Sequence, residues 1–251
     1  MSGFRAFYDF SKNGEPREGG RAELSAEESR HLCGSLRAVD GDRVDIFDLS
    51  GKVFECEICG ASPKRALVKV LRRAPPAKPK FAVYLAQCLP KGKTFDDIIR
   101  QCVEIGAAGI FPLVSERTLV RIENSEKAKK LEKWNSHVVE AVKQSANFSS
   151  FEMAEPESLK SFLESRTGGF GLKIAASLRA GTLPILEILR ENDAESVCIL
   201  VGPEGDLTEA EYDAAEKAGF LPATLGQNVM KCDTAAVFAM SASIAGMQCK
   251  K

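Results

Sequence analysis

The stretch Gly202-Pro203-Glu204-Gly205 ends an apolar run and precedes a charged helical pattern. Thr208 and Glu211 have the spacing of a capping box, which predicts a helix that begins after Thr208. The first N–H groups of that helix lack partners within it, and such a terminus attracts carboxylates and phosphates. Glycines let a ligand approach the backbone closely. The stretch therefore indicates either a small-molecule site at the end of a strand or a tight structural turn with an ordinary cap.

A second stretch, LGQNVMKCDTAAVFAMSASIAG from Leu225 to Gly246, repeats this arrangement. Leu225-Gly226 is expected to end a strand, residues 227–232 form a loop, and Asp233 or Thr234 caps the next helix. That helix is rich in Ala, Ser and Gly, which permit close approach of the backbone. A tight core, a subunit interface and a bound ligand all fit this composition.

The hydrophobic pattern divides the 251 residues into two parts. Up to residue 74 it has period two, with a hairpin over 42–58 that turns at 48–51 and a further strand at 65–71. Pro75, Pro76 and Pro79 then forbid helix. We therefore expect a small β-rich domain over 1–74, a linker over 75–80, and an α/β domain over 81–251.

The α/β part alternates strands with helices, which predicts a parallel sheet with covering helices. Its first units are a strand at 81–89, a helix that ends at Gly106, a strand at 109–114 and a long helix over about 125–146. The later units are a helix near 157–165, a strand at 172–178, a helix at 183–192, a strand at 196–202, the helix after Thr208, a strand at 223–226 and a helix from about 234.

Composition excludes several classes of protein. With 44% hydrophobic and 27% charged residues the chain is typical of a globular protein, and its formal net charge of −1 leaves only local patches to attract nucleic acid. No apolar run is long enough for a membrane span, so we expect a cytoplasmic protein without a membrane partner. Cys56-x-x-Cys59 has no second such pair, and His31 and His137 lack ligand spacing, so we expect no metal.

Three stretches together resemble the RsmE family of SPOUT-class methyltransferases, which methylate N3 of a uridine in 16S ribosomal RNA. They are LVGPEGDLTEAE at 200–211, LGQNVMKCDTAA at 225–236 and LPKGKTFDDIIRQCVEIGAAGIFPLVSERTLV at 89–120. The segment HLCGSLRAVDGDRVDIFD at 31–48 resembles part of that family's PUA-like RNA-binding barrel. The resemblance implies an α/β fold with a trefoil-knotted parallel-sheet domain after a small PUA-like β-barrel. It also implies a homodimer that acts on 16S rRNA of the small ribosomal subunit.

The resemblance further implies that three loops bind S-adenosyl-L-methionine. The matching residues in this sequence are Ala175, Ser177, Leu178, Leu200, Val201, Gly202, Pro203, Glu204, Gly205, Leu225, Gly226, Gln227, Asn228, Val229 and Met230.

Methylation at N3 requires that the nitrogen lose its proton, and a carboxylate is a suitable base. Asp233 matches the family's Glu in the motif R-x-L-R-x-E-T-A and is the first candidate, with Glu204 and Glu116 behind it. Helix capping is the alternative role for Asp233.

Several family positions differ in this chain. Asn228 and Lys231 stand where that motif has arginines, and Asn147 ends the stretch KQSAN where the family has E-Q-S-G-R. Loss of these arginines removes bidentate contacts to phosphate or base, which lysine cannot reproduce. The candidates for RNA phosphate contacts are Lys91, Lys93, Arg100, Arg117, Arg121 and Lys231, with solvated surface charge as the alternative.

Gly-Lys-Thr at 92–94 suggests a nucleotide-binding P-loop, but that motif needs glycine where this chain has Gln87. The remaining alternative to an enzyme is a knotted RNA-binding protein that binds rRNA, with or without the methyl donor, and has no turnover.

Overall fold

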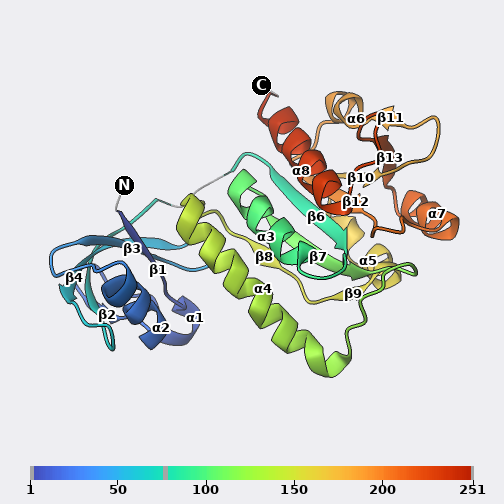
Figure 1. Ribbon diagram of the computed structural model, residues 1–251. Helices are drawn as coiled ribbons and strands as arrows, with labels where there is room; N and C mark the ends of the chain where they lie inside the picture. Colours follow the sequence, from blue (N-terminus) through green and yellow to red (C-terminus); the bar gives the residue numbers. More distant parts are fainter. Residues whose placement is uncertain (1–2, 76–78, 250–251) are drawn as a thin grey trace. The chain divides into compact units, whose positions relative to one another are not determined.

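The computed structural model describes residues 3–75 and 79–249, which form two compact units (Figure 1). Of the described residues, the first unit comprises 3–75 with 142–151, and the second comprises 79–141 with 152–249. The predicted boundaries were continuous in sequence, whereas the first unit takes in a distant segment. Of the predicted linker at 75–80, residues 76–78 lie outside the described part of the chain.

The first unit is built on a five-stranded sheet in which β1 runs parallel to β3 and the other neighbours are antiparallel. Its strands, in sheet order, are β1 (Phe4–Phe7), β3 (Arg43–Phe47), β4 (Val53–Gly60), β5 (Leu67–Arg73) and β2 (Arg21–Glu23). Helices α1 (Phe10–Asn13) and α2 (Ala26–Ser29) and a π-helical turn (Arg30–Ser35) complete it. The predicted hairpin and third strand are β3, β4 and β5, so these predictions are confirmed.

The segment 142–151 belongs to the first unit because its side chains pack there. The rings of Phe148 and Phe47 lie 5.3 Å apart between centroids. The Lys143 ammonium lies 2.6 Å from the Glu28 carboxylate, and both side chains are at least nine-tenths buried. A buried ion pair is costly to break, since one charge would remain without a partner. These contacts fix the segment against the β-rich part of the chain.

The second unit is built on a sheet whose strands all pair in parallel, as the sequence predicted. Its order is β11 (Leu183–Pro184), β13 (Leu221–Thr224), β10 (Leu172–Ala176), β12 (Ser196–Val201), β6 (Ala82–Cys88), β7 (Gly109–Val114) and β8 (Glu152–Met153), with β9 (Glu157–Ser158) also paired to β7. Its helices are α3 (Thr94–Ile105), α4 (Asn124–Ser145, the last turn counted with the first unit), α5 (Leu159–Ser165), α6 (Ile185–Glu191), α7 (Glu209–Lys217) and α8 (Cys232–Gln248), with a 3-10 turn at Thr167–Gly169.

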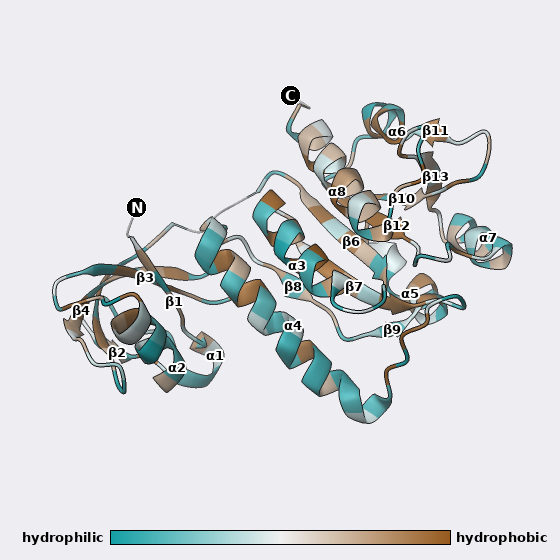
Figure 2. Ribbon diagram, viewed as in Figure 1, coloured by the Kyte–Doolittle hydropathy of each residue, from teal (hydrophilic) through white to brown (hydrophobic). Residues whose placement is uncertain are grey.

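Helices cover both faces of this sheet. Helix α8 contacts β6 and β12 and lies beside α3 and α6, while α5 contacts β7 and lies beside α7. On the α5 side, Ala86 and Cys88 of β6 share one buried cluster with Phe162 and Ala215. Figure 2 shows the hydrophobic colour along β6 and β7 and mostly hydrophilic colour along α4. Burial on both faces explains why the central strands read as continuous apolar runs.

Two helix ends agree with the sequence and one does not. Helix α3 ends at Gly106, which has a left-handed φ of 92°, and α7 begins after Thr208 with the predicted capping box. Helix α8 begins at Cys232 with Lys231 as its N-cap, so the prediction that Asp233 or Thr234 caps it is wrong. Asp233 lies in the first turn, where its Oδ1 accepts the N–H of Thr234 at 2.9 Å.

Within residues 3–75 and 79–249, no helix is both long and apolar enough to cross a bilayer. In the same ranges, no three His, Cys, Asp or Glu side chains are grouped so that they could hold a metal ion, and the eight cysteines are free thiols.

Gly109 lies where β7 meets β6 and β8, and a Cβ atom there would be 2.6 Å from the Glu152 carbonyl oxygen. We expect Gly109→Ala to lower the free energy of unfolding by about 2 kcal/mol, because the backbone of β8 would have to move. Urea denaturation measures this. Gly168→Ala is the control, since no atom lies within 4 Å of its added Cβ. Equal unfolding midpoints for the two variants would contradict this packing.

Candidate functional site

The loops that follow β10, β12 and β13 leave the sheet at one edge. These strands are parallel neighbours, with Ala175 paired to both Leu200 and Pro222. Ligands of open α/β sheets bind beyond the carboxyl ends of the strands. A cavity of about 560 Å³ lies among these loops and includes Thr94 of α3, which follows the neighbouring strand β6.

Most of the predicted methyl-donor residues line this cavity: Ser177, Leu178, Val201, Gly202, Pro203, Glu204, Leu225, Gly226, Asn228, Val229 and Met230. Four do not: Ala175 and Leu200 are buried within strands, Gly205 lies against Arg117, and Gln227 is exposed.

Ala176, inside the predicted loop 175–178, also lines the cavity. Five further wall residues were not predicted: Thr94, Asp206, Thr224, Cys232 and Ala235. Asp206 and Thr224 are direct neighbours of predicted positions, so extending each predicted loop by one residue would have found them. Thr94 required knowing that β6 lies beside β12.

The turn after β12 is held in shape by Asp206, which has a left-handed φ of 61°. Its N–H donates to the Pro203 carbonyl at 2.9 Å, and its Oδ1 accepts the Tyr212 hydroxyl at 2.7 Å and the Leu207 N–H at 2.8 Å. Burial raises the pKa of Tyr212, and the hydrogen bond to Asp206 raises it further, so this hydroxyl stays protonated and donates. A Cβ at Gly202 would lie 3.3 Å from Asp206 Oδ1, which explains glycine at this close approach.

Neighbouring loops hold the same turn from outside. Glu204 Oε1 accepts the backbone N–H of Lys91 at 2.8 Å, and Arg117 Nη1 donates to the carbonyl of Gly205 at 2.9 Å. The glycine turn is therefore connected both to the loop after β6 and to the loop after β7.

The loop after β10 is fastened to α7 through Arg179. Its guanidinium forms ion pairs with Glu209, with Asp213 at 3.0 Å and with Glu216 at 2.7 Å. It also lies 4.8 Å from the centre of the Tyr212 ring, within range of a cation–π interaction. Helix α7 thus fixes two of the three loops that line the cavity.

Two of the three catalytic candidates line the cavity. Glu204 and Asp233 belong to the wall, together with the buried thiol of Cys232. Burial, with a smaller contribution from these two carboxylates, raises the pKa of Cys232 to about 11. The thiol is therefore protonated at neutral pH and is a poor nucleophile. Glu116 lies outside the wall, where its backbone N–H donates to Glu211 Oε1 at 2.7 Å.

Three of the predicted RNA-contact residues lie at or near the cavity. Lys231 is part of its wall. Lys91 and Lys93 are exposed in the short segment between β6 and α3, next to the wall residue Thr94. These cations are available to phosphate groups near the cavity.

The three arginines that were predicted to contact RNA phosphates are not part of the cavity wall. Arg100 forms an ion pair with Asp97 on the surface of α3. Arg117 donates to Gly205 and, at 3.4 Å, to the carbonyl of Leu207, so part of its hydrogen-bonding capacity serves the glycine turn. Arg121 is exposed before α4.

The positions that differ from the family pattern fall in both units. Asn228, Lys231 and Asp233 line the cavity of the second unit, whereas Asn147 belongs to the first unit.

Comparison with known proteins identifies the class. The RNA methyltransferase domain family matches residues 77–244, and the RNA methyltransferase PUA domain family matches 24–71. The chain is an RNA methyltransferase with an N-terminal PUA domain, and its cavity lies at the strand ends of the methyltransferase unit. Ribosomal RNA small subunit methyltransferase E of Synechocystis sp. is 30% identical over 223 residues, which cover 87% of this chain and 71% of the relative. The chain belongs to the ribosomal RNA small subunit methyltransferase E family, RsmE, which confirms the resemblance.

Solved structures agree with this assignment. A methyltransferase from Legionella pneumophila, in complex with SAM, has a TM-score of 0.85 and 27% identity, and the match covers 96% of this chain and 97% of that one. Ribosomal RNA small subunit methyltransferase E from Neisseria gonorrhoeae, bound to S-adenosyl methionine, has a TM-score of 0.82 and 25% identity over 97% and 96% of the two chains.

We expect Tyr212→Phe to lower the free energy of unfolding by about 1 kcal/mol, because Asp206 loses a buried hydrogen bond. Chemical denaturation measures this. Tyr84→Phe is the control: that ring packs on Phe111 and Phe170, and no described residue accepts a hydrogen bond from its hydroxyl. If the two variants lose the same stability, the hydroxyl of Tyr212 does not hold the turn.

Proposed function

We propose that this enzyme transfers the methyl group of S-adenosyl-L-methionine to N3 of a uridine in 16S ribosomal RNA of the small ribosomal subunit. The observation that carries the proposal is the cavity at the joined ends of β10, β12 and β13, lined by the loops expected to bind the methyl donor. Family membership and the relatives solved with this cofactor support it.

The cavity suits the methyl donor in size and chemistry. Its volume of about 560 Å³ lies within the range of roughly 300–1,000 Å³ that is usual for small-molecule sites. Leu178, Leu225 and Met230 offer apolar surface to a purine ring. Glu204 and Asp206 add carboxylates to the wall, and carboxylates attract positively charged groups such as a sulfonium or an ammonium.

The donor supplies an electrophilic methyl group, whose bond to sulfur breaks as its bond to N3 forms. The protein must hold N3 in line with that bond and accept the N3 proton. Asp233 is our candidate base, because its carboxylate lines the cavity in the first turn of α8. Glu204 and Asp233 each accept one backbone N–H, from Lys91 and from Thr234, so these bonds do not separate the two candidates. The match to the family's Glu is what makes Asp233 the first candidate. Glu116 has less support, since it lies outside the wall.

Cys232 is the thiol in the wall of the cavity. Burial raises its pKa to about 11, so its surroundings do not activate it as a thiolate nucleophile. Direct transfer to a deprotonated ring nitrogen needs no such nucleophile.

The target uridine must be unpaired or turned out of its helix to reach the cavity. We propose that the PUA-like unit binds the surrounding RNA, and that Lys91, Lys93 and Lys231 contact phosphates near the cavity. It stays a prediction that phosphates of the RNA also contact Arg100, Arg117 and Arg121. A ribosomal substrate implies action in the cytoplasm.

We also propose a trefoil-knotted chain and a homodimer, both implied by the family resemblance. Apolar side chains on α6 and α8 support an interface there, since Leu186 is 46% and Phe238 43% exposed. Because α6 and α8 contact each other, a partner subunit that covers one of these helices could also cover the other.

Ala235 lines the cavity from α8, and leucine is a good helix former. We expect Ala235→Leu to keep the helix but fill part of the cavity, and so to weaken binding of S-adenosyl-L-methionine by about tenfold or more. Isothermal titration calorimetry measures this. Ala245→Leu is the matched control, because Ala245 is exposed on the same helix and outside the wall. Wild-type affinity in both variants would count against this cavity as the donor site.

We expect Asp233→Asn to slow methyl transfer by about 100-fold, within the usual contribution of a general base, and to change donor affinity little. The assay uses small ribosomal subunits that lack the modification, with radiolabelled donor. Glu116→Gln is the control and should retain activity. If Asp233→Asn transfers methyl groups at the wild-type rate, another group takes the proton. Donor binding by the wild type without any transfer would favour a binding protein that lacks turnover.

A further inference from the structure

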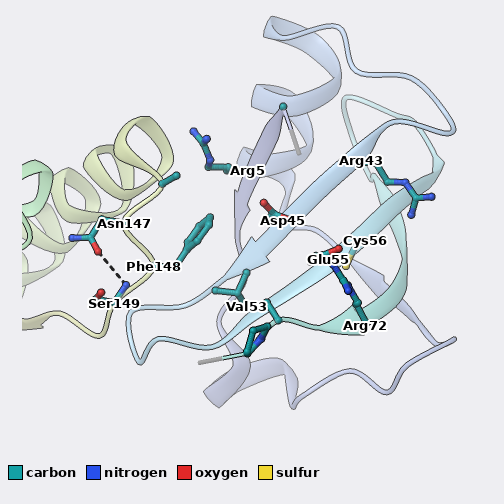
Figure 3. A pocket seen from close by; sticks show the side chains of 14 residues that line it. Arg5, Arg43, Asp45, Val53, Glu55, Cys56, Arg72, Asn147, Phe148 and Ser149 are labelled. Atoms are coloured by element: carbon teal, nitrogen blue, oxygen red, sulfur yellow. Dashed lines mark hydrogen bonds and ion pairs between the residues drawn. The ribbon is translucent and has the colours of Figure 1, made fainter. Parts of the chain in front are cut away.

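The first unit contains a second cavity, of about 890 Å³, that the methyl-transfer site does not use (Figure 3). Strands β1, β3, β4 and β5 contribute to its wall, together with Gly3, Ala74, Pro75 and residues 146–149. All of these elements belong to one compact unit. The cavity therefore depends on the packing of 142–151 against the β-rich part.

Two arginines, on the strands β3 and β5 that flank β4, form the rim of this cavity, each paired with a glutamate. Arg43 pairs with Glu57 at 3.4 Å and Arg72 with Glu55 at 2.7 Å, and the arginine side chains are 57% and 67% exposed. The Arg72 guanidinium lowers the pKa of Glu55, which therefore stays ionised. Exposed pairs of this kind contribute roughly 0–1 kcal/mol, so each guanidinium can turn to a phosphate at little cost.

An aromatic ring stands on the other side of the cavity. Phe148 is half-buried, and its inner side packs on Phe47 with 5.3 Å between ring centres. Its loop is held by Asn147, whose Oδ1 accepts the Ser149 N–H at 3.2 Å. Figure 3 shows Phe148 on the segment that carries Asn147 and Ser149, with its ring between the side chains of Arg5 and Val53 in this view. A fixed ring with an accessible surface is a stacking platform for a nucleobase.

Polar groups line the cavity between the ring and the rim. Arg5 Nη1 donates to the Lys143 carbonyl at 2.5 Å, which fixes the side chain, while its buried Nε meets no hydrogen-bond acceptor among residues 3–75 and 79–249. Asp45, on the strand next to Arg5, also lines the cavity and already has an interaction partner in the protein. The buried Nε of Arg5 is therefore the donor that is left for a ligand, and the polar edge of a base carries acceptors for it.

We propose that this cavity binds one unpaired nucleotide of the RNA, with its phosphate at Arg43 and Arg72 and its base on Phe148. The inference rests on the proposed function only in taking RNA as the substrate. It assigns the PUA-like unit a specific pocket for single-stranded RNA, in addition to a general attraction for the RNA backbone.

The first test measures binding of a fluorescein-labelled single-stranded RNA of about twelve nucleotides to the intact protein by fluorescence anisotropy. We expect Arg72→Ala to weaken binding about fivefold and Arg43→Ala/Arg72→Ala at least about tenfold. The slope of log affinity against log salt should become shallower by about 0.7 for each phosphate that the variant no longer neutralises. Arg65→Ala is the matched control, because Arg65 forms a similarly exposed pair with Glu23 at 2.6 Å outside this cavity. We expect it to bind RNA as the wild type does.

The second test addresses the ring. We expect Phe148→Leu to weaken RNA binding by about fivefold or more, the lower end of the usual stacking contribution, with a small effect on the unfolding midpoint. Phe7→Leu is its control, since Phe7 also packs on Phe47, at 6.0 Å between ring centres, but lies outside the cavity wall. Equal losses of RNA affinity in the two variants would show a structural effect and overturn the stacking role.

The remaining outcomes are decisive as well. If Arg72→Ala and Arg65→Ala bind RNA equally well, the pocket does not hold a phosphate and the proposal fails. If the double variant keeps RNA affinity but loses methylation of small subunits, the pocket contacts a ribosomal protein instead, which also overturns it. All these variants should bind S-adenosyl-L-methionine normally by calorimetry. Failure of the wild type to bind that donor would contradict the proposed function and leave the RNA measurements standing.

Discussion

The parallel register of β10, β12 and β13 is the constraint on which the functional site depends. Because Ala175 is level with both Leu200 and Pro222, the three strands end together and their loops must meet at one edge. The strands cannot slide, since a shift of one residue would turn buried side chains toward the wrong face. Both faces are covered by helices, so the loops at the strand ends are the part of this sheet most open to a ligand.

Loops at a common edge still need a fixed shape, and neighbouring elements provide it for the glycine turn. Gln87 Nε2, fully buried in β6, donates to the Gly202 carbonyl at 3.4 Å, while Tyr212 holds Asp206 from α7. The turn has therefore already lost its conformational entropy when the protein folds. A ligand that enters the cavity does not have to order the turn, which favours affinity and correct alignment of the reacting atoms.

The sequence predicted those elements whose signals are local. Helix α3 was recognisable from its apolar spacing and its terminal glycine, and α7 from its capping box. Strands of two residues, such as β8, β9 and β11, are too short to have a period, so the sequence could not reveal them. The start of α8 was misjudged because Asp233 has the side chain of a cap, although the chain at Lys231 already has the extended backbone of an N-cap. The contact of Phe148 with Phe47 joins residues about a hundred positions apart, so no local sequence pattern could predict it.

The position of Asn147 connects the departures from the family pattern with the second cavity. In the family resemblance this position is an arginine, whose guanidinium would be suited to phosphate. Here position 147 is an uncharged amide, which accepts the Ser149 N–H and shapes the loop that carries Phe148. Arg43 and Arg72 line the same cavity and supply the charge that position 147 lacks. Replacement of one arginine therefore need not remove affinity for RNA, because the sheet offers others around the same cavity.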